Sequence, residues 1–326
     1  MQRPVVFCAM VALLVAAGVG RAQQQGETPS APAPQASAPQ PASAAPGEPQ
    51  FPPVNPANFD APTPTKAEVE AFLKNSWGYD ANRVWEVYAI QKTIAPGVSK
   101  VTVYVGEKPG QQVGNMSFFV TPDGKHLIAQ DSVLDFGAHP FENNYRLLQE
   151  KANGPSRGAT AKQFELVEFA DFECPHCKDA QPIVEKLLHD FPQAHYVYET
   201  FPLVNIHPQA FRAAAWGACV EQQKGNDAFF KYADSIFAAQ SELAGQGADQ
   251  ALRNSATAAG ADPDKIAACA DSPAGKSAVE ASMHLGSELN IDETPTLFID
   301  GRAVPMMAVP YDRLKDIIEY QFALDK

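Results

Sequence analysis

Two cysteines separated by two residues, Cys174 and Cys177, constrain the fold of this chain more than any other feature of its sequence. They follow the run from Phe164 to Phe169, which is apolar on both faces and predicts a buried, central strand. The apolar spacing after them predicts a helix that continues to about Asp190. The pair therefore lies at a junction between a strand and a helix, where the first helical turn has unpaired N–H groups.

The position of each cysteine in this turn predicts its chemistry. The unpaired N–H groups and the positive end of the helix dipole favour a thiolate, so Cys174 should be an exposed nucleophile with a low pKa. Cys177, one turn later, should face inward and close the disulfide. Pro175 suits the first helical turn, and His176 adds a titratable donor or a positive charge near the Cys174 sulfur. Because a stabilised thiolate favours the reduced form, we expect this pair to donate its disulfide to other thiols.

Two structural roles compete with redox chemistry for this pair. A zinc site would need two further ligands at comparable spacing, whereas the other cysteines are single and no pair of histidines is nearby. A structural disulfide across two residues closes a very small loop, so it stabilises a fold little. Redox chemistry is the better interpretation, and it implies neither a metal nor an organic cofactor.

The N-terminus has the pattern of an export signal. Arg3 supplies a positive charge, residues 5–20 are apolar, and the small residues Gly20 and Ala22 suit cleavage after residue 22, which predicts a signal peptide at 1–22. The alternative is an uncleaved membrane anchor, since the apolar run is close to the shortest that spans a bilayer. We therefore expect a periplasmic or otherwise extracytoplasmic protein, where disulfides persist.

Composition divides the rest of the chain. Residues 23–65 are rich in Pro, Ala, Ser and Gln, which predicts a disordered, semi-stiff linker. Residues 66–150 predict a small α+β domain, and residues 158–326 predict a redox domain with a largely helical insertion at about 208–290. The net charge of −13 argues against a nucleic-acid partner, because binding phosphates requires a basic surface.

The run from Phe169 to Cys177, the later run from Thr294 to Gly301 and the helical block between them resemble the DsbA-type thioredoxin-fold family. The resemblance implies an α/β, thioredoxin-like fold with a helical insertion. It also implies that Pro295 is a cis-proline beside the cysteines and that the Thr294 backbone binds an extended substrate peptide like a neighbouring strand. The alternative for this Thr-Pro pair is a turn at the entry to a strand.

Three further residues gain a role from this resemblance. Glu168 is an acid among apolar neighbours on the predicted strand, and similar family members carry a buried acid there as a proton relay. The alternative is that its face of the strand is partly exposed. Cys219 and Cys269 are left over in an oxidising compartment, and some relatives have a second disulfide in the helical block, so we predict that they pair. The alternative is two buried free thiols.

The stretches 94–103 and 119–128 resemble the cystatin-like dimerisation domain of the DsbC and DsbG isomerases. Residues 106–114 depart from that pattern. The resemblance implies a homodimer whose two redox domains face a cleft. The alternative is a dimerising or spacer domain that does not contact substrate.

Together these features predict an extracytoplasmic thiol:disulfide oxidoreductase that introduces disulfides into unfolded or reduced secreted proteins. A membrane redox partner would recycle it. Pro175 and His176 favour an oxidase, whereas Thr294 and the N-terminal resemblance favour a dimeric isomerase or reductase. A chaperone that binds substrate without catalysis is a third hypothesis, against which the intact cysteines argue.

Overall fold

The computed structural model describes residues 47–130 and 132–324, and it forms two compact units that divide after Ala138. The expected signal peptide and the first part of the expected linker, residues 23–46, lie outside the described residues. Across the described ranges, no helix combines the length and the apolar character needed to cross a bilayer.

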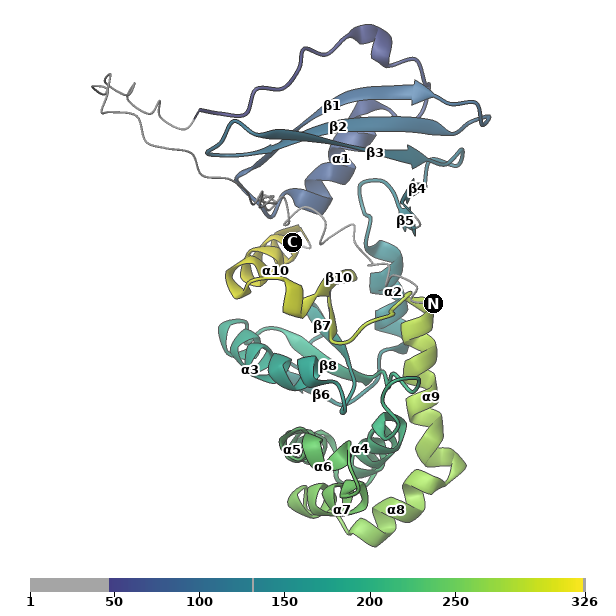
Figure 1. The fold of residues 1–326 in the computed structure, drawn as a ribbon, viewed down its shortest axis with the longest axis vertical. Coiled ribbons are helices and arrows are strands. Elements are labelled where there is room, and N and C mark those ends of the chain that lie inside the picture. The colour runs from purple at the N-terminus through teal and green to yellow at the C-terminus, as the bar shows by residue number, and fades with distance from the viewer. Residues whose placement is uncertain (1–46, 131, 325–326) are drawn as a thin grey trace, which may run out of the picture. The chain divides into compact units, whose positions relative to one another are not determined.

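The first unit is an antiparallel sheet of five strands in the order β1-β2-β3-β4-β5, with helix α1 across one face (Figure 1). Its elements are η1 (Pro56–Asn58), α1 (Lys66–Trp77), β1 (Arg83–Lys92), β2 (Ser99–Glu107), β3 (Val113–Val120), β4 (His126–Ala129) and β5 (Ser132–Asp135). Helix α1 begins with a capping box, in which the Glu68 N–H donates to Thr65 Oγ1 and the Thr65 N–H donates to the Glu68 carboxylate.

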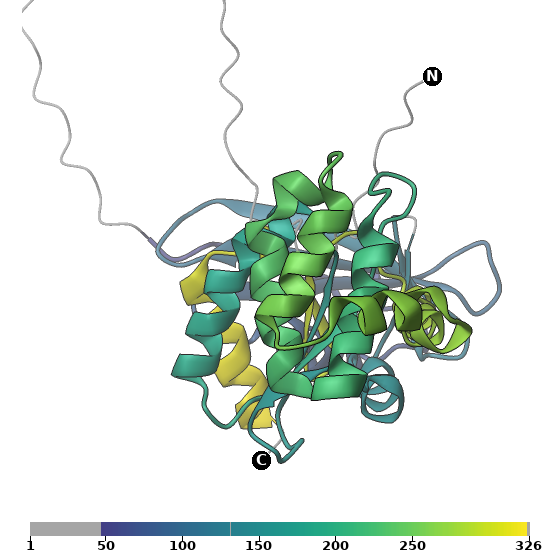
Figure 2. The ribbon, with the colours of Figure 1, turned by 90° about the horizontal axis from the view of Figure 1, so that it is seen from below.

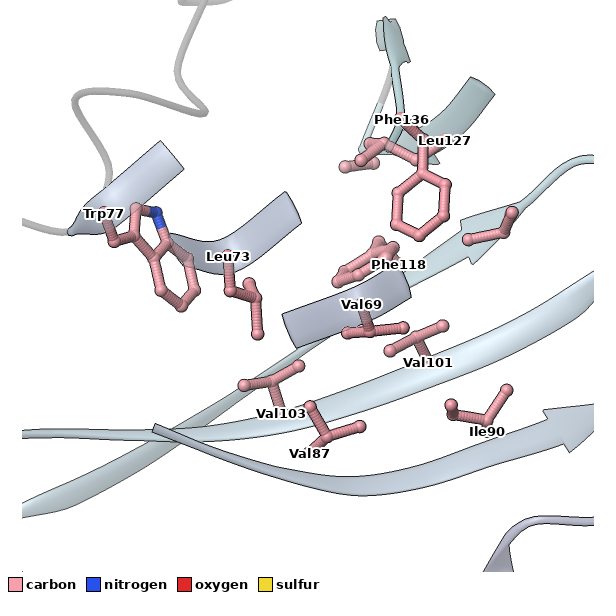
Figure 3. Packing of buried hydrophobic residues seen from close by; sticks show 12 residues of the cluster. Val69, Leu73, Trp77, Val87, Ile90, Val101, Val103, Phe118, Leu127 and Phe136 are labelled. Carbon is pink, nitrogen blue, oxygen red and sulfur yellow. The ribbon is translucent and has the colours of Figure 1, made fainter. Parts of the chain in front are cut away.

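The core of this unit forms because α1 is apolar at helical spacing and the strands are apolar at alternate residues. Val69, Leu73 and Trp77 point from α1 toward the sheet, where they meet side chains of β1, β2, β3 and β4 (Figure 3). Phe118 and Phe136 close the cluster, with ring centroids 6.3 Å apart. The unit is therefore α+β, with its apolar interior between one helix and one sheet face.

The segment directly before α1 differs from the disordered linker that its composition predicts. Phe59 forms an isolated bridge with Ile90 of β1, and the Ala61 N–H donates to the Ile90 carbonyl. The Asp60 carboxylate accepts a hydrogen bond from the Lys92 N–H at 2.8 Å. Phe59 also packs against the core, so one aromatic side chain in a proline-rich run gives this segment apolar area to bury.

One row of apolar side chains lies on the sheet face opposite the core. Phe119, Ile128 and Val133 are neighbours across β3, β4 and β5, and they are 41%, 36% and 64% exposed. Lys100 of β2 continues the same row beside Phe119. We call Phe119, Ile128 and Val133 the outer apolar row.

The second unit contains a five-stranded mixed sheet in the order β10-β9-β7-β8-β6. Its strands are β6 (Ser156–Gly158), β7 (Glu165–Ala170), β8 (His195–Thr200), β9 (Thr296–Ile299) and β10 (Arg302–Pro305). Strand β7 is central, pairing in parallel with β8 and antiparallel with β9. Helix α2 (Glu142–Lys151) also belongs to this unit, so the division lies before a helix that the sequence assigned to the N-terminal domain.

Side chains of β7 alternate between two helical layers. Val167 and Phe169 pack with Leu148 of α2 and Leu285 of the later helix α9 (Pro273–Glu288). On the other side of the molecule's second sheet, α3 (Pro175–Asp190) and α10 (Tyr311–Leu324) lie side by side (Figure 2). The Tyr311 hydroxyl joins them by donating to Asp190 at 2.8 Å.

The helical insertion lies between β8 and β9 in the chain. Its helices are α4 (Ala210–Lys224), α5 (Asn226–Ala238), α6 (Gln240–Leu243), α7 (Ala248–Ala258), α8 (Pro263–Asp271) and α9. They pack on one another as a helical layer (Figure 2). The interior of this layer contains many alanine side chains together with buried aromatic residues such as Trp216 and Tyr232. The small alanine side chains let the helices approach closely.

Candidate active site

Cys174 and Cys177 lie where β7 ends and α3 begins. Cys174 is the N-cap of α3, with φ −72° and ψ 119°, and its side chain makes no capping hydrogen bond. Pro175 occupies the first turn, where its missing N–H is not needed. The Cys174 sulfur therefore lies at the N-terminal end of the helix, where the N–H groups of the first turn and the positive end of the helix dipole favour a thiolate.

The surroundings of Cys174 stabilise a thiolate. Hydrogen bonding from the Cys177 thiol is the largest cause that lowers the pKa of Cys174 to about 5, and burial acts against it. The Thr294 side chain and the backbone N–H groups of Cys177 and His176 lower the pKa further. The sequence predicted an exposed cysteine, but Cys174 is only 4% exposed because Pro175 and Thr294 flank it.

Cys177 lies in the opposite environment. Its side chain is fully buried, and Sγ accepts a hydrogen bond from the Asp171 N–H at 3.3 Å. Burial raises the pKa of Cys177 well above its ordinary value. The two thiols are thus unequal, with a stabilised thiolate on Cys174 and a neutral, inward thiol on Cys177.

His176 contributes through its backbone and not in the way its side chain suggested. The His176 N–H is among the groups that lower the pKa of Cys174, whereas its imidazole is exposed to solvent. Pro175 is also exposed. The backbone N–H of His176 thus contributes to the site, and a role of its imidazole near the Cys174 sulfur stays a prediction.

Thr294 and Pro295 come from a distant part of the chain and lie against the cysteines. The Thr294–Pro295 peptide bond is cis, and β9 begins at the next residue. When protonated, Cys174 Sγ donates to the Thr294 carbonyl at 3.4 Å, across a separation of 120 residues. The fold therefore assembles one site from the start of α3 and the entry to β9.

Glu168 is completely buried on β7, so its face of the strand is not the exposed one. Its carboxylate accepts a short hydrogen bond from the Tyr196 hydroxyl, and its second oxygen, Oε1, has no partner among the described residues. Burial raises the pKa of Glu168 to about 7, although the Tyr196 hydrogen bond opposes this rise. The negative charge of Glu168 is also one cause of the raised pKa of Cys177.

A family model described as thioredoxin matches residues 150–320, which include the cysteine pair and the cis-proline. The chain belongs to the thioredoxin family. The expected thioredoxin-like fold with a helical insertion is confirmed.

The curated proteins that this chain resembles include Na(+)/H(+) antiporters and a disulfide bond formation protein. The Na(+)/H(+) antiporter NhaA 3 of Salinispora tropica is 32% identical over 146 residues, which are 45% of this chain and 21% of the antiporter, so the match spans about a fifth of the antiporter's length. Disulfide bond formation protein D of Bacillus subtilis is 26% identical over 171 residues, 51% of this chain and 75% of that protein. Among solved structures, Proteus mirabilis ScsC in a transitional conformation is 22% identical and has a TM-score of 0.46, over 56% of this chain and 77% of that one.

The structure adds two polar residues that the sequence did not identify as part of the site, the buried Asp171 and the half-buried His207. The Asp171 carboxylate accepts hydrogen bonds from the N–H groups of Glu173 and Leu203 and pairs with His207 Nδ1 at 2.8 Å. Asp171 lies inside the motif that resembles the family, whereas no motif in the sequence includes His207. Nothing in the local sequence links His207 to a residue 36 positions earlier.

Cys219 of α4 and Cys269 of α8 form a disulfide, with Cα atoms 6.0 Å apart and a sequence separation of 50. This bond joins two helices of the insertion. Cys174 and Cys177 are free thiols in the same structure. In the part of the chain that the structure describes, no three His, Cys, Asp or Glu side chains are grouped so that they could hold a metal ion.

Proposed function

We propose that this chain is an extracytoplasmic thiol:disulfide oxidoreductase that introduces disulfides into unfolded exported proteins through Cys174 and Cys177. The observation that carries the proposal is the contrast between the two thiols. A stabilised thiolate at Cys174 favours the reduced pair, so the disulfide form tends to accept electrons from other thiols. Export rests on the N-terminal pattern of the sequence.

The proposed reaction transfers two electrons from a substrate dithiol to the cysteine pair. A substrate thiolate attacks Cys174 Sγ of the disulfide, a mixed disulfide forms, and the bond to Cys177 breaks. Cys177 leaves as a thiolate and takes up a proton, for which Glu168 is the proposed donor because it is buried beside Cys177 and has a pKa of about 7. A second substrate thiolate then attacks the substrate sulfur and releases Cys174 as a thiolate. The substrate leaves with a disulfide, and the protein is left with a reduced pair.

Thr294 and apolar surface residues are the proposed contacts for the substrate chain. The backbone beside the cis-proline can pair with an extended peptide as a neighbouring strand does. Val204 and Ile206, which are 48% and 68% exposed, lie in the loop that Asp171 binds. Met307, 42% exposed, belongs to the short helix η2 (Met306–Ala308), which packs against α3. An unfolded chain offers both the extended backbone and the apolar side chains that such a surface would bind.

The test uses reduced and scrambled ribonuclease as separate substrates, together with the reduction potential of the Cys174–Cys177 pair. We expect the disulfide form to oxidise reduced ribonuclease stoichiometrically and the potential to be well above that of a thioredoxin-like reductant. Failure to oxidise the reduced substrate, combined with rescue of the scrambled one, would replace the oxidase by an isomerase. A membrane redox partner that reoxidises the pair is part of the proposal, and added oxidant takes its place in this assay.

A dimeric isomerase is the second candidate, and the outer apolar row is the observation that favours it. Phe119, Ile128 and Val133 form a continuous exposed strip on a sheet of the N-terminal unit. Such a strip suits association with another chain. Light scattering of the full chain and of its Ile128→Lys variant tests this idea. A monomer in both cases would remove the dimeric candidate.

A further inference from the structure

The loop between β7 and α3 is held by the helical insertion through one glutamine. Gln240 begins α6, and its side-chain Nε2 donates to the carbonyls of Phe172 and Cys174, at 2.9 Å each. An amide group has two N–H donors, so one side chain can satisfy both carbonyls. These two carbonyls lie on either side of Glu173, 66 to 68 residues before Gln240 in the chain.

We infer that Gln240 is a positioning residue for the redox reaction, because it holds the Cys174 carbonyl in the orientation that directs the first N–H groups of α3 at the Cys174 sulfur. The inference rests on the proposed role of Cys174 as the reacting thiol. It assigns to the helical insertion a direct part in setting the reactivity of that thiol.

The geometry of the first helical turn explains how this works. The Cys174 carbonyl already accepts the N–H groups of Cys177 and Lys178, at 3.1 and 3.3 Å, which starts the hydrogen-bond ladder of α3. Gln240 adds a third donor to the same carbonyl from outside the helix. The peptide plane that carries this carbonyl ends at Pro175, which has no N–H to fix it from its other side. Gln240 therefore restrains the peptide plane between Cys174 and Pro175. Rotation of this plane would move the Cys174 sulfur relative to the N–H groups in the first turn of α3.

A second contact shows that the insertion approaches this loop at more than one point. The Glu173 carboxylate accepts the N–H of Gln209, directly before α4. Glu173 and the two carbonyls bound by Gln240 are consecutive, so three adjacent residues of the loop are tied to the insertion. The contact made by Gln240 differs from the contact between Glu173 and Gln209, because it includes a hydrogen bond to the carbonyl of Cys174 itself.

The test compares Gln240→Met and Gln240→Glu with Gln250→Met in the full chain. Gln250 is a glutamine of the same insertion that is exposed and donates only to Asn254, on its own helix, so it is a matched control. Methionine keeps the length of the side chain without its donors, and glutamate replaces both donors by acceptors. The readouts are the pH dependence of Cys174 alkylation, followed by mass spectrometry of its peptide, and the reduction potential of the pair.

For Gln240→Met we expect Cys174 alkylation below pH 6 to slow by about fivefold, the effect of losing the hydrogen bond to the Cys174 carbonyl, and the potential to become more negative. Gln240→Glu should shift both further in the same direction. Gln250→Met should match the unmodified protein. If both Gln240 variants keep the alkylation profile and the potential of the control, and only thermal stability falls, the residue is merely structural and the inference is wrong.

The two hypotheses fail in different ways in this design. Alkylation of Cys174 needs no protein substrate, so it reports the positioning role even if the chain does not oxidise ribonuclease. Loss of the proposed function would leave the effect of Gln240 on Cys174 intact. Should Gln240→Met fail to fold, Gln240→Glu provides the same readouts.

Discussion

The two cysteine pairs of this protein consist of the same residue type but differ in their separation along the chain and in whether their sulfurs are bonded. Cys174 and Cys177 are three residues apart at the start of one helix and are free thiols, whereas Cys219 and Cys269 are 50 residues apart on two helices and are bonded. A bond between distant residues removes much freedom from the unfolded chain, but a bond across one helical turn removes little. The comparison shows that spacing determines which pair can stabilise the fold, and that the environment of each sulfur determines which pair can react.

The largest difference should appear when one cysteine of each pair is replaced. We expect Cys174→Ser to reduce the oxidation of reduced ribonuclease to the uncatalysed rate, because no sulfur remains to form the mixed disulfide. Cys177→Ser should instead accumulate mixed disulfides with substrate, detectable by non-reducing electrophoresis. If Cys174→Ser keeps its activity, the assignment of the reactive pair is wrong.

The pH dependence of alkylation should separate the two thiols of the reactive pair. With a pKa of about 5, Cys174 should react with iodoacetamide at a rate that rises up to about pH 5 to 6 and then levels off. At pH 6 the thiolate fraction of Cys174 should exceed that of an ordinary cysteine by about a hundredfold or more, since each pKa unit changes this fraction tenfold. Cys177, buried and with a raised pKa, should remain unlabelled throughout.

The same pKa has a consequence for stability. The pKa of Cys174 falls from an ordinary 9.0 to about 5 on folding of the reduced protein. A lowered pKa stabilises the folded state fully above the pKa of the unfolded chain, and this contribution is lost as the pH falls through 5. The reduced form should therefore gain stability relative to the disulfide form between about pH 5 and 9, which urea unfolding of both forms can measure. An equal pH dependence of the two forms would contradict a thiolate at Cys174.

Removal of the second pair should affect stability and leave the chemistry almost unchanged. We expect Cys219→Ala with Cys269→Ala to lower the free energy of unfolding by about 2–4 kcal/mol, because the closed loop of 50 residues is released. The rate of ribonuclease oxidation at 25 °C should stay within about twofold. A large loss of rate in a folded variant would mean that the Cys219–Cys269 disulfide also controls the active site. The contrast between a stabilising pair and a reactive pair would then no longer hold.

Glu168 is buried on the strand that precedes the reactive pair, and its charge acts on Cys177, so its replacement should change the chemistry of that pair. Glu168→Gln keeps the shape and can still accept from Tyr196, but it cannot carry a proton. We expect the pH–rate profile of mixed-disulfide formation, the step in which Cys177 leaves, to lose an inflection near pH 7 and the rate to fall by about tenfold. Tyr198→Phe is the control, because its buried hydroxyl has no hydrogen-bond partner among the described residues.

The raised pKa of Glu168 should affect the pH dependence of stability in the direction opposite to that of the Cys174 thiolate. Since the pKa of Glu168 is raised to about 7 on folding, its ionisation destabilises the folded state increasingly from about pH 4.5 to 7. The glutamine variant should therefore be more stable above pH 7, by about 3 kcal/mol, and similar to the unmodified protein below pH 4. Urea unfolding at pH 4 and pH 8 measures this difference. A variant that is equally or less stable at pH 8 would argue against a buried, ionising carboxyl.

His176→Ala should have the smallest effect. Its imidazole is exposed, and the contribution of His176 to the thiolate comes from a backbone N–H that alanine retains. We expect the rate of Cys174 alkylation to change by about twofold or less. A tenfold decrease would restore the direct role of the imidazole that the sequence suggested.

Most elements could be predicted because their signals are local. The capping box at Thr65, the strand before Cys174 and the helix that begins at Pro175 each depend on neighbouring residues. The turn at Asp300 and Gly301, where both residues have positive φ, is equally local. The edge strands β5 and β6 are harder to predict, because short edge strands have little apolar alternation to distinguish them from loops.

The sequence by itself determined the chemistry of this protein, since two cysteines with this spacing at a helix start have few other uses. It also indicated Pro295 and Glu168, through resemblance to a family. Only the tertiary structure decided how unequal the two thiols are, because burial, the approach of Thr294 and the hydrogen bonds of Gln240 come from segments 66 to 120 residues away in the chain. Such long-range contacts depend on how helices and strands pack, and no local pattern in the sequence records them.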